Sequence, residues 1–223
     1  MKRVIVFASG TKDGGGSGFQ KLVENTRTGM FEADIVAVVS SHENGGVRER
    51  AECLGIPFIF FPQFKNATAD DYQRVVADAN VEFVLLSGWL HRTRGLDPRT
   101  TINIHPGPLP RFGGKGMYGY HVHEAVLKAH RAGEVKASAV SMHFVTDEYD
   151  QGPVFFQYPV EIFPNDTAES LQERVGREEH LWQSKISHLV VCGAISWDGK
   201  NSETLIVPRR YRFHRFVSAS FHR

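Results

Sequence analysis

The chain has 223 residues, of which 41% are hydrophobic and 23% are charged, and its formal net charge is +1. This composition predicts one large globular domain with a substantial core, and the near-neutral charge gives no indication of nucleic-acid or membrane binding. The apolar run at residues 4–8 is too short for a signal peptide, and no run approaches the roughly 20 apolar residues of a membrane span, so we expect a cytoplasmic protein.

The first 105 residues alternate between strand-like and helix-like segments, a pattern typical of a mostly parallel, Rossmann-like sheet with helices on both faces. The expected strands are residues 3–8, 34–40, 57–61, 83–86 and 101–105. The expected helices are residues 19–28, 47–54 and 68–79, the last with Thr68 as its N-cap. Residues 87–99 are irregular and rich in cations, and we expect them to line a ligand pocket.

The second half predicts a helix at residues 120–132, two antiparallel strands at 137–145 and 154–160, and a long closing helix at 167–192, with Thr167 at its start. We therefore expect one α/β domain over residues 1–200 and a basic carboxyl-terminal tail over residues 201–223. The tail's charge is interpreted as solvation, with an acidic partner as the alternative. Cys53 and Cys192 lie far apart without CxxC spacing, which predicts buried, reduced thiols.

A glycine-rich segment separates the first strand from the first helix. Backbone N–H groups of Gly16, Ser17 and Gly18 at the start of that helix favour phosphate binding, and a flexible turn is the alternative interpretation. The segment has neither a P-loop lysine nor a complete G-x-G-x-x-G, so a dinucleotide site is disfavoured.

Asn103 and His105 stand two residues apart on a predicted strand, so both side chains leave it on the same face at the end where parallel sheets bind ligands. Asp150 lies just before a Gly-Pro turn. A carboxylate close to the His105 ring would raise the pKa of the imidazole and hold the ring as a cation. Amide, imidazolium and carboxylate together suit addition to a carbonyl group. The alternative is that Asn103, His105 and Asp150 each have only a structural role.

Neither a covalent nucleophile nor a metal site is indicated. No serine or cysteine lies in an elbow motif, and HExxH is absent. His121 and His123 lie near a helix start, and His143 lies within a strand where we expect no nearby partner. We interpret Trp89 and Phe112 as core residues rather than as stacking platforms.

The segments NIHPGPLPRFGGKGMYGYHVHEAV and SMHFVTDEYDQGPVFFQ, together with the glycine loop, resemble the phosphoribosylglycinamide formyltransferases of purine biosynthesis over about residues 3–199. The resemblance implies transfer of a formyl group from the co-substrate 10-formyltetrahydrofolate to 5-phosphoribosylglycinamide, without a metal. It makes Asn103, His105 and Asp150 the catalytic set, with Gly16, Ser17 and Gly18 on the substrate phosphate and Glu179 near its ribose and glycinamide. The implied folate-binding residues are Leu90, His91, Arg92, Thr93, Thr146, Asp147, Glu148, Tyr149 and Asp150.

Three positions differ from the family's usual pattern. Gly18 replaces an asparagine, Ala69 stands near a folate-binding arginine, and Gly176 stands where relatives often carry a glutamine. The alternatives are a related formyl-folate enzyme and a non-catalytic sensor. A related enzyme would act on initiator tRNA or a sugar nucleotide, or hydrolyse the formyl folate. The length of the chain argues against both the tRNA enzymes and the hydrolases. The expected partners are small molecules, and the expected assembly is a monomer or homodimer.

Overall fold

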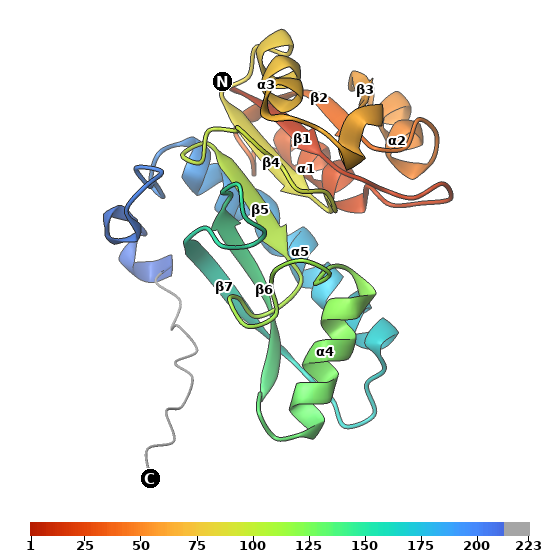
Figure 1. Ribbon diagram of the computed structural model, residues 1–223, viewed down its shortest axis with the longest axis vertical. Coiled ribbons are helices and arrows are strands. Elements are labelled where there is room, and N and C mark those ends of the chain that lie inside the picture. Colours follow the sequence, from red (N-terminus) through yellow and green to blue (C-terminus); the bar gives the residue numbers. More distant parts are fainter. Residues whose placement is uncertain (212–223) are drawn as a thin grey trace.

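A computed structural model, which describes residues 1–211, is built on one seven-stranded sheet of order β3-β2-β1-β4-β5-β6-β7 (Figure 1). The strands are β1 (Lys2–Phe7), β2 (Ala33–Ser40), β3 (Phe58–Phe60), β4 (Phe83–Ser87), β5 (Thr101–His105), β6 (Ala137–Phe144) and β7 (Val154–Glu161). Strands β1 to β5 pair in parallel, and β6 is antiparallel to both of its neighbours. The predicted α/β class, with antiparallel strands in the second half, is confirmed.

Helices cover both faces of this sheet. They are α1 (Ser17–Arg27), α2 (Gly46–Leu54), α3 (Ala69–Asp78), α4 (Tyr120–Arg131) and α5 (Ala168–Val191). Alternate residues of β1 face different cores: Val4 and Val6 pack with α1, α2, α4 and α5, whereas Ile5 and Phe7 pack toward α3. Figure 1 shows the long α5 passing behind β5 and β6, with α4 beside it.

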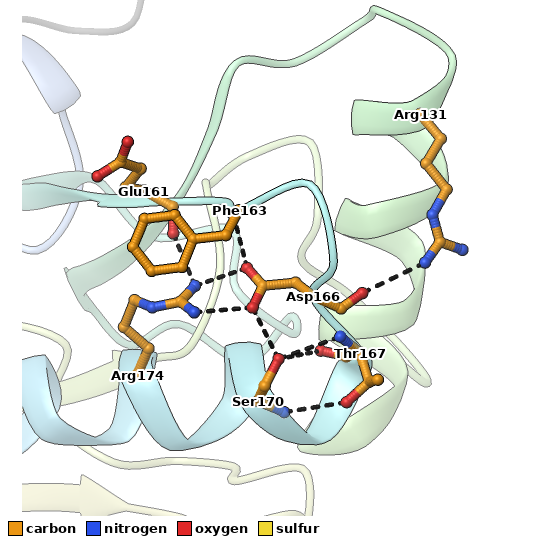
Figure 2. A network of polar contacts seen from close by, with 7 residues as sticks. All are labelled: Arg131, Glu161, Phe163, Asp166, Thr167, Ser170 and Arg174. Atoms are coloured by element: carbon orange, nitrogen blue, oxygen red, sulfur yellow. Dashed lines mark hydrogen bonds and ion pairs between the residues drawn. The ribbon is translucent and has the colours of Figure 1, made fainter.

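The start of α5 is fixed by a polar network around Asp166, which Figure 2 shows. Arg174 donates two hydrogen bonds to the Asp166 carboxylate, both at 2.7 Å, and the Ser170 hydroxyl and the Phe163 amide donate at the same distance. The predicted N-cap Thr167 accepts from the Ser170 amide in a capping box, as Thr68 does from Asp71 at α3. Arg174, together with these other donors, holds the pKa of Asp166 well below its ordinary value.

Two expectations need correction or extension. Cys53 and Cys192 are exposed, not buried, because both lie on the solvent side of their helix ends. The basic segment after residue 200 is not detached from the domain. Ile206 bridges to Ser196, and Leu205 packs against the main core. The boundary at residue 200 stays a prediction, and residues 212–223 of the predicted tail lie outside the described residues. Within the described part, no helix is long and apolar enough to cross a membrane.

Candidate active site

A cavity of about 480 Å³ opens where the strand order reverses, at the carboxyl ends of β1, β4 and β5. Ligands of open α/β sheets bind at such a switch point, and this volume is in the range of small-molecule sites. Four groups of predicted site residues line it: the glycine loop, the Asn103–His105 pair, Asp150 and Glu179. Residues 114–119, which the sequence did not single out, form a further wall.

Asn103 and His105 leave β5 on one face, as their spacing predicts, while Ile102 and Ile104 pack into the core on the other. The His105 ring is 3% exposed, and its Nε2 lies 2.7 Å from the Phe112 carbonyl oxygen. Because a carbonyl only accepts, Nε2 carries the proton in this contact. The other ring nitrogen, Nδ1, lies 3.8 Å from Asp150 Oδ2.

The prediction of a cationic His105 is wrong for the free protein. Burial lowers the pKa of His105, and this effect outweighs the opposing one of the nearby Asp150 carboxylate. The loop after β5 encloses the ring, which the sequence alone did not reveal. His105 is therefore held neutral, with Nδ1 available as a base.

Asp150 lies near His105, as the sequence suggested, but its closest imidazole is His143. Asp150 has a φ of 54°, and its Oδ2 accepts a 2.9 Å hydrogen bond from the Gly114 amide. Its Oδ1 lies 3.3 Å from His143 Nε2. Burial acts to raise the pKa of Asp150, but the two histidines and the Gly114 amide together hold it below its ordinary value, so the carboxylate is charged.

The expectation that His143 lacks partners is wrong, because its Nε2 lies close to both Asn103 and Asp150. His143 lies directly opposite Asn103 in the antiparallel β5–β6 ladder, and the Asn103 amide nitrogen is 3.1 Å from its Nε2. Its Nδ1 donates to the Phe144 carbonyl at 2.7 Å. A neutral His143 therefore accepts from Asn103, whereas a protonated one donates to Asp150. The available signal was the cross-strand register, which pairs residues 40 apart.

The glycine loop brings the start of α1 to the cavity wall. Gly16 is the N-cap with a φ of 80°, and no side chain caps the helix or supplies acidic charge in its first turn. A side chain at Gly16 would begin 3.0 Å from Val47 Cγ2, so the left-handed turn and the close packing both require glycine. Ser17 Oγ lies 3.1 Å from His180 Nε2 on α5. The first-turn N–H groups thus face the cavity without a side-chain acceptor.

Glu179 lines the same cavity from α5. It makes no hydrogen bond or ion pair with the residues that the structure describes, and burial raises its pKa to about 7. Gly176, one turn earlier, has open space around it. A carboxyl group without a partner, titrating near neutral pH, is suited to contact a polar ligand.

The two predicted folate segments, residues 90–93 and 146–150, lie together at a second, smaller hollow beside the cavity. Leu90 lines the main cavity instead, and Asp147 lines neither. Arg92 joins the two segments, because its guanidinium donates to the Asp147 carbonyl and pairs with the Glu148 carboxylate. Ala69 lies against Gly95, where an added Cβ would come within 2.5 Å of the Ala69 methyl group. The cation next to this hollow is therefore Arg92, and nothing at position 69 supplies one. No cluster of metal-ligating side chains occurs among residues 1–211.

Comparisons with known proteins agree with this geometry. Residues 2–186 match the family model described as formyl transferase. The chain is 36% identical over 205 residues to the chloroplastic phosphoribosylglycinamide formyltransferase of Arabidopsis thaliana, covering 88% of this chain and 68% of that one. It is 31% identical over 194 residues to the phosphoribosylglycinamide formyltransferase of Bacillus subtilis, covering 83% and 93%.

The fold matches as well. The crystal structure of glycinamide ribonucleotide transformylase 1 from Symbiobacterium toebii superposes with a TM-score of 0.78 at 26% identity, covering 93% of this chain and 95% of that one. The family match spans most of the described residues and includes every residue that lines the cavity. The chain therefore belongs to the formyl transferase family.

Proposed function

We propose that this protein transfers a formyl group from 10-formyltetrahydrofolate to the amine of 5-phosphoribosylglycinamide, the de novo purine-biosynthesis reaction for which its relatives are named. The observation that carries the proposal is the convergence of Asn103, His105 and Asp150 on the cavity that the start of α1 also enters. Backbone donors for a phosphate lie beside an amide, a neutral imidazole and a carboxylate. This set suits a phosphorylated amine that attacks a carbonyl carbon.

In the first step, the substrate amine adds to the formyl carbon, and the electron pair of the C=O bond moves to its oxygen. Asn103 donates an N–H to that oxyanion, which leaves the amide's hydrogen bond to His143 to set the amide's orientation. His105 Nδ1 accepts the proton that the amine loses on attack. The imidazolium that results lies 3.8 Å from the Asp150 carboxylate, which stabilises it.

In the second step, the C=O bond re-forms and the bond from carbon to the folate nitrogen breaks. His105 returns its proton to the departing nitrogen, directly or through water, and ends neutral as it began. Asp150 stays charged throughout, since the two neighbouring histidines and the Gly114 amide keep its pKa low. The protein therefore gains and loses no proton over one complete turnover.

The substrates divide between the two hollows. The backbone N–H groups of Gly16, Ser17 and Gly18 hold the phosphate, and Glu179 contacts the ribose or glycinamide. The residues around the smaller hollow hold the folate, largely through backbone groups; these are Leu90, His91, Arg92, Thr93, Thr146, Asp147, Glu148 and Tyr149. A cytoplasmic location and a monomeric or homodimeric assembly remain part of the proposal.

The test is formyl transfer from 10-formyltetrahydrofolate to synthetic 5-phosphoribosylglycinamide, followed by folate absorbance, in the wild type and in His105→Ala. Folate release that depends on the acceptor and is lost in His105→Ala supports the transferase. Release without acceptor would instead identify a hydrolase. Binding of both ligands without any release would favour a sensor and overturn the mechanism.

A further inference from the structure

Gln183 is a buried polar residue on the cavity wall that the reaction steps above do not use. It lies on α5 one helical turn after Glu179, so both side chains project from the same side of the helix. The residue is only 3% exposed, yet it lines the cavity. A side chain so deeply buried, with part of its surface in a ligand cavity, has a fixed position before any ligand arrives.

One end of the Gln183 amide is held and the other is free. The Ser87 hydroxyl, at the end of β4, donates to Gln183 Oε1 at 3.1 Å. The amide nitrogen, Nε2, makes no hydrogen bond with any of the described residues. Because Ser87 fixes the oxygen, the two N–H groups of Nε2 point elsewhere. Nε2 keeps accessible surface on the cavity wall, so its donors are open to a ligand oxygen.

The close approach at Gly18 places this amide beside the first turn of α1. A Cβ at Gly18 would lie 2.4 Å from Ser87 Oγ and 3.3 Å from Gln183 Oε1. The Ser87–Gln183 pair therefore fills the space that a side chain at position 18 would need. Gly18 is the second residue of α1, so its N–H is one of the free first-turn donors.

We propose that Gln183 is a specificity-determining residue whose Nε2 donates a hydrogen bond to an oxygen of the substrate's phosphoribosyl group, with Ser87 as its positioning residue. The inference rests on the proposed function for the identity of the substrate. The bond supplements the backbone donors of α1 with a side-chain donor from α5. An acceptor oxygen on the phosphate and one on the adjoining ribose have the same chemistry, and binding of inorganic phosphate distinguishes them.

The test compares Gln183→Met with the wild type and with Gln172→Met, which makes the same change at an exposed position of the same helix. Methionine keeps the length of the side chain and removes the donor. We expect the KM for 5-phosphoribosylglycinamide and the Kd for ribose 5-phosphate to rise about tenfold in Gln183→Met, because the lost bond goes to a charged or strongly polar oxygen. The KM for formyl folate and kcat should stay within about twofold of the wild type, and Gln172→Met should match the wild type.

Two further measurements keep the outcomes separate. Ser87→Ala retains Gln183 but frees its oxygen, so the Kd for ribose 5-phosphate should rise by a smaller factor, about threefold. Weaker binding of inorganic phosphate in Gln183→Met places the bond on the phosphate, and unchanged binding places it on the ribose. If the wild type transfers no formyl group but binds ribose 5-phosphate in a Gln183-dependent way, the proposed function fails and this site stands. If both variants fold and bind ribose 5-phosphate as the wild type does, the inference is overturned.

Discussion

Asp166 and Asp150 are both buried or nearly buried carboxylates with lowered pKa values, but the protein surrounds them differently. Asp166 accepts four hydrogen bonds, two of them from the permanent charge of Arg174 (Figure 2). Asp150 has one amide donor at 2.9 Å and two histidines, at 3.3 and 3.8 Å, whose charge depends on protonation. The first arrangement has no capacity left for a ligand or a proton, whereas the second keeps it. The same residue type thus stabilises the fold in one place and, in the proposed mechanism, takes part in catalysis in the other.

The same substitution at both positions tests this difference between the two aspartates, beginning with Asp150→Asn. The neutral amide keeps the size of the side chain but no longer stabilises the imidazolium form of His105, so we expect kcat to fall by about 10²–10³. The free energy of unfolding should change by no more than about 1 kcal/mol. Single-turnover formyl transfer and urea unfolding measure the two effects. A large loss of stability with little loss of turnover would reverse the assignment.

Asp166→Asn should give the opposite result. It leaves Arg174 partly buried without its counter-charge and weakens the start of α5, so we expect the free energy of unfolding to fall by about 2–3 kcal/mol. Turnover at a temperature where the variant is folded should stay near that of the wild type.

The matched control is Asp97→Asn, which removes the surface carboxylate that Arg99 contacts and should change stability far less. Equal losses of stability at positions 97 and 166 would show that burial of the pair does not matter.

His143→Leu tests whether His143 orients the Asn103 amide. Leucine cannot accept from Asn103, so the amide loses the contact that orients it, and we expect kcat to fall about tenfold with little change in either KM. Phe144→Leu, a change in the core beyond the site, serves as the control for general loosening of β6. A fall in kcat that the control reproduces would make His143 a structural residue only.

The free energy of unfolding should depend on pH in two ranges, one set by the histidines, among them His105 beside Asp150, and one by Asp166 itself. Burial lowers the pKa of His105 from 6.5, so the folded protein binds fewer protons than the unfolded chain, and this stability is present above pH 6.5 and lost as the pH falls. His91 and His123, whose burial lowers their pKa to about 4, act in the same direction.

The lowered pKa of Asp166 adds stability that is present above pH 3.8 and lost below it. Urea unfolding between pH 3 and 8 should therefore show a decline that begins near pH 6.5 and steepens below about 4. Asp166→Asn should reduce the lower part of this decline and leave the upper part unchanged. Stability that rises between pH 7 and 5 would contradict the neutral state of His105.

The parts of the molecule that the sequence predicted are those set by neighbours along the chain. The strand at Thr101–His105 and the caps at Thr68 and Thr167 follow from local hydrophobic spacing and hydroxyl chemistry. The Gly-Pro turn after Asp150 made that residue a candidate, but only the resemblance to the family connected it with His105.

Other features depend on contacts between distant segments. The partnership of His143 with Asn103 requires the register of β5 against β6, and the neutral state of His105 requires the loop that encloses it. The contact of Ser87 with Gln183 joins residues 96 apart. Neither hydrophobic periodicity nor capping rules show which residues far apart in the sequence are in contact, so these features could be found only in the folded chain.

The polar network at the start of α5 has a second consequence, which concerns angle rather than stability. Thr167 and Asp166 fix where the helix begins, and Glu179 and Gln183 face the cavity because of the number of residues that follow that start. Each added residue turns an α-helix by about 100°. One residue inserted between Arg174 and Glu179 would leave a sound helix and an intact network, yet it would rotate both side chains away from the cavity. The network thus sets the rotational phase of a site more than two helical turns away.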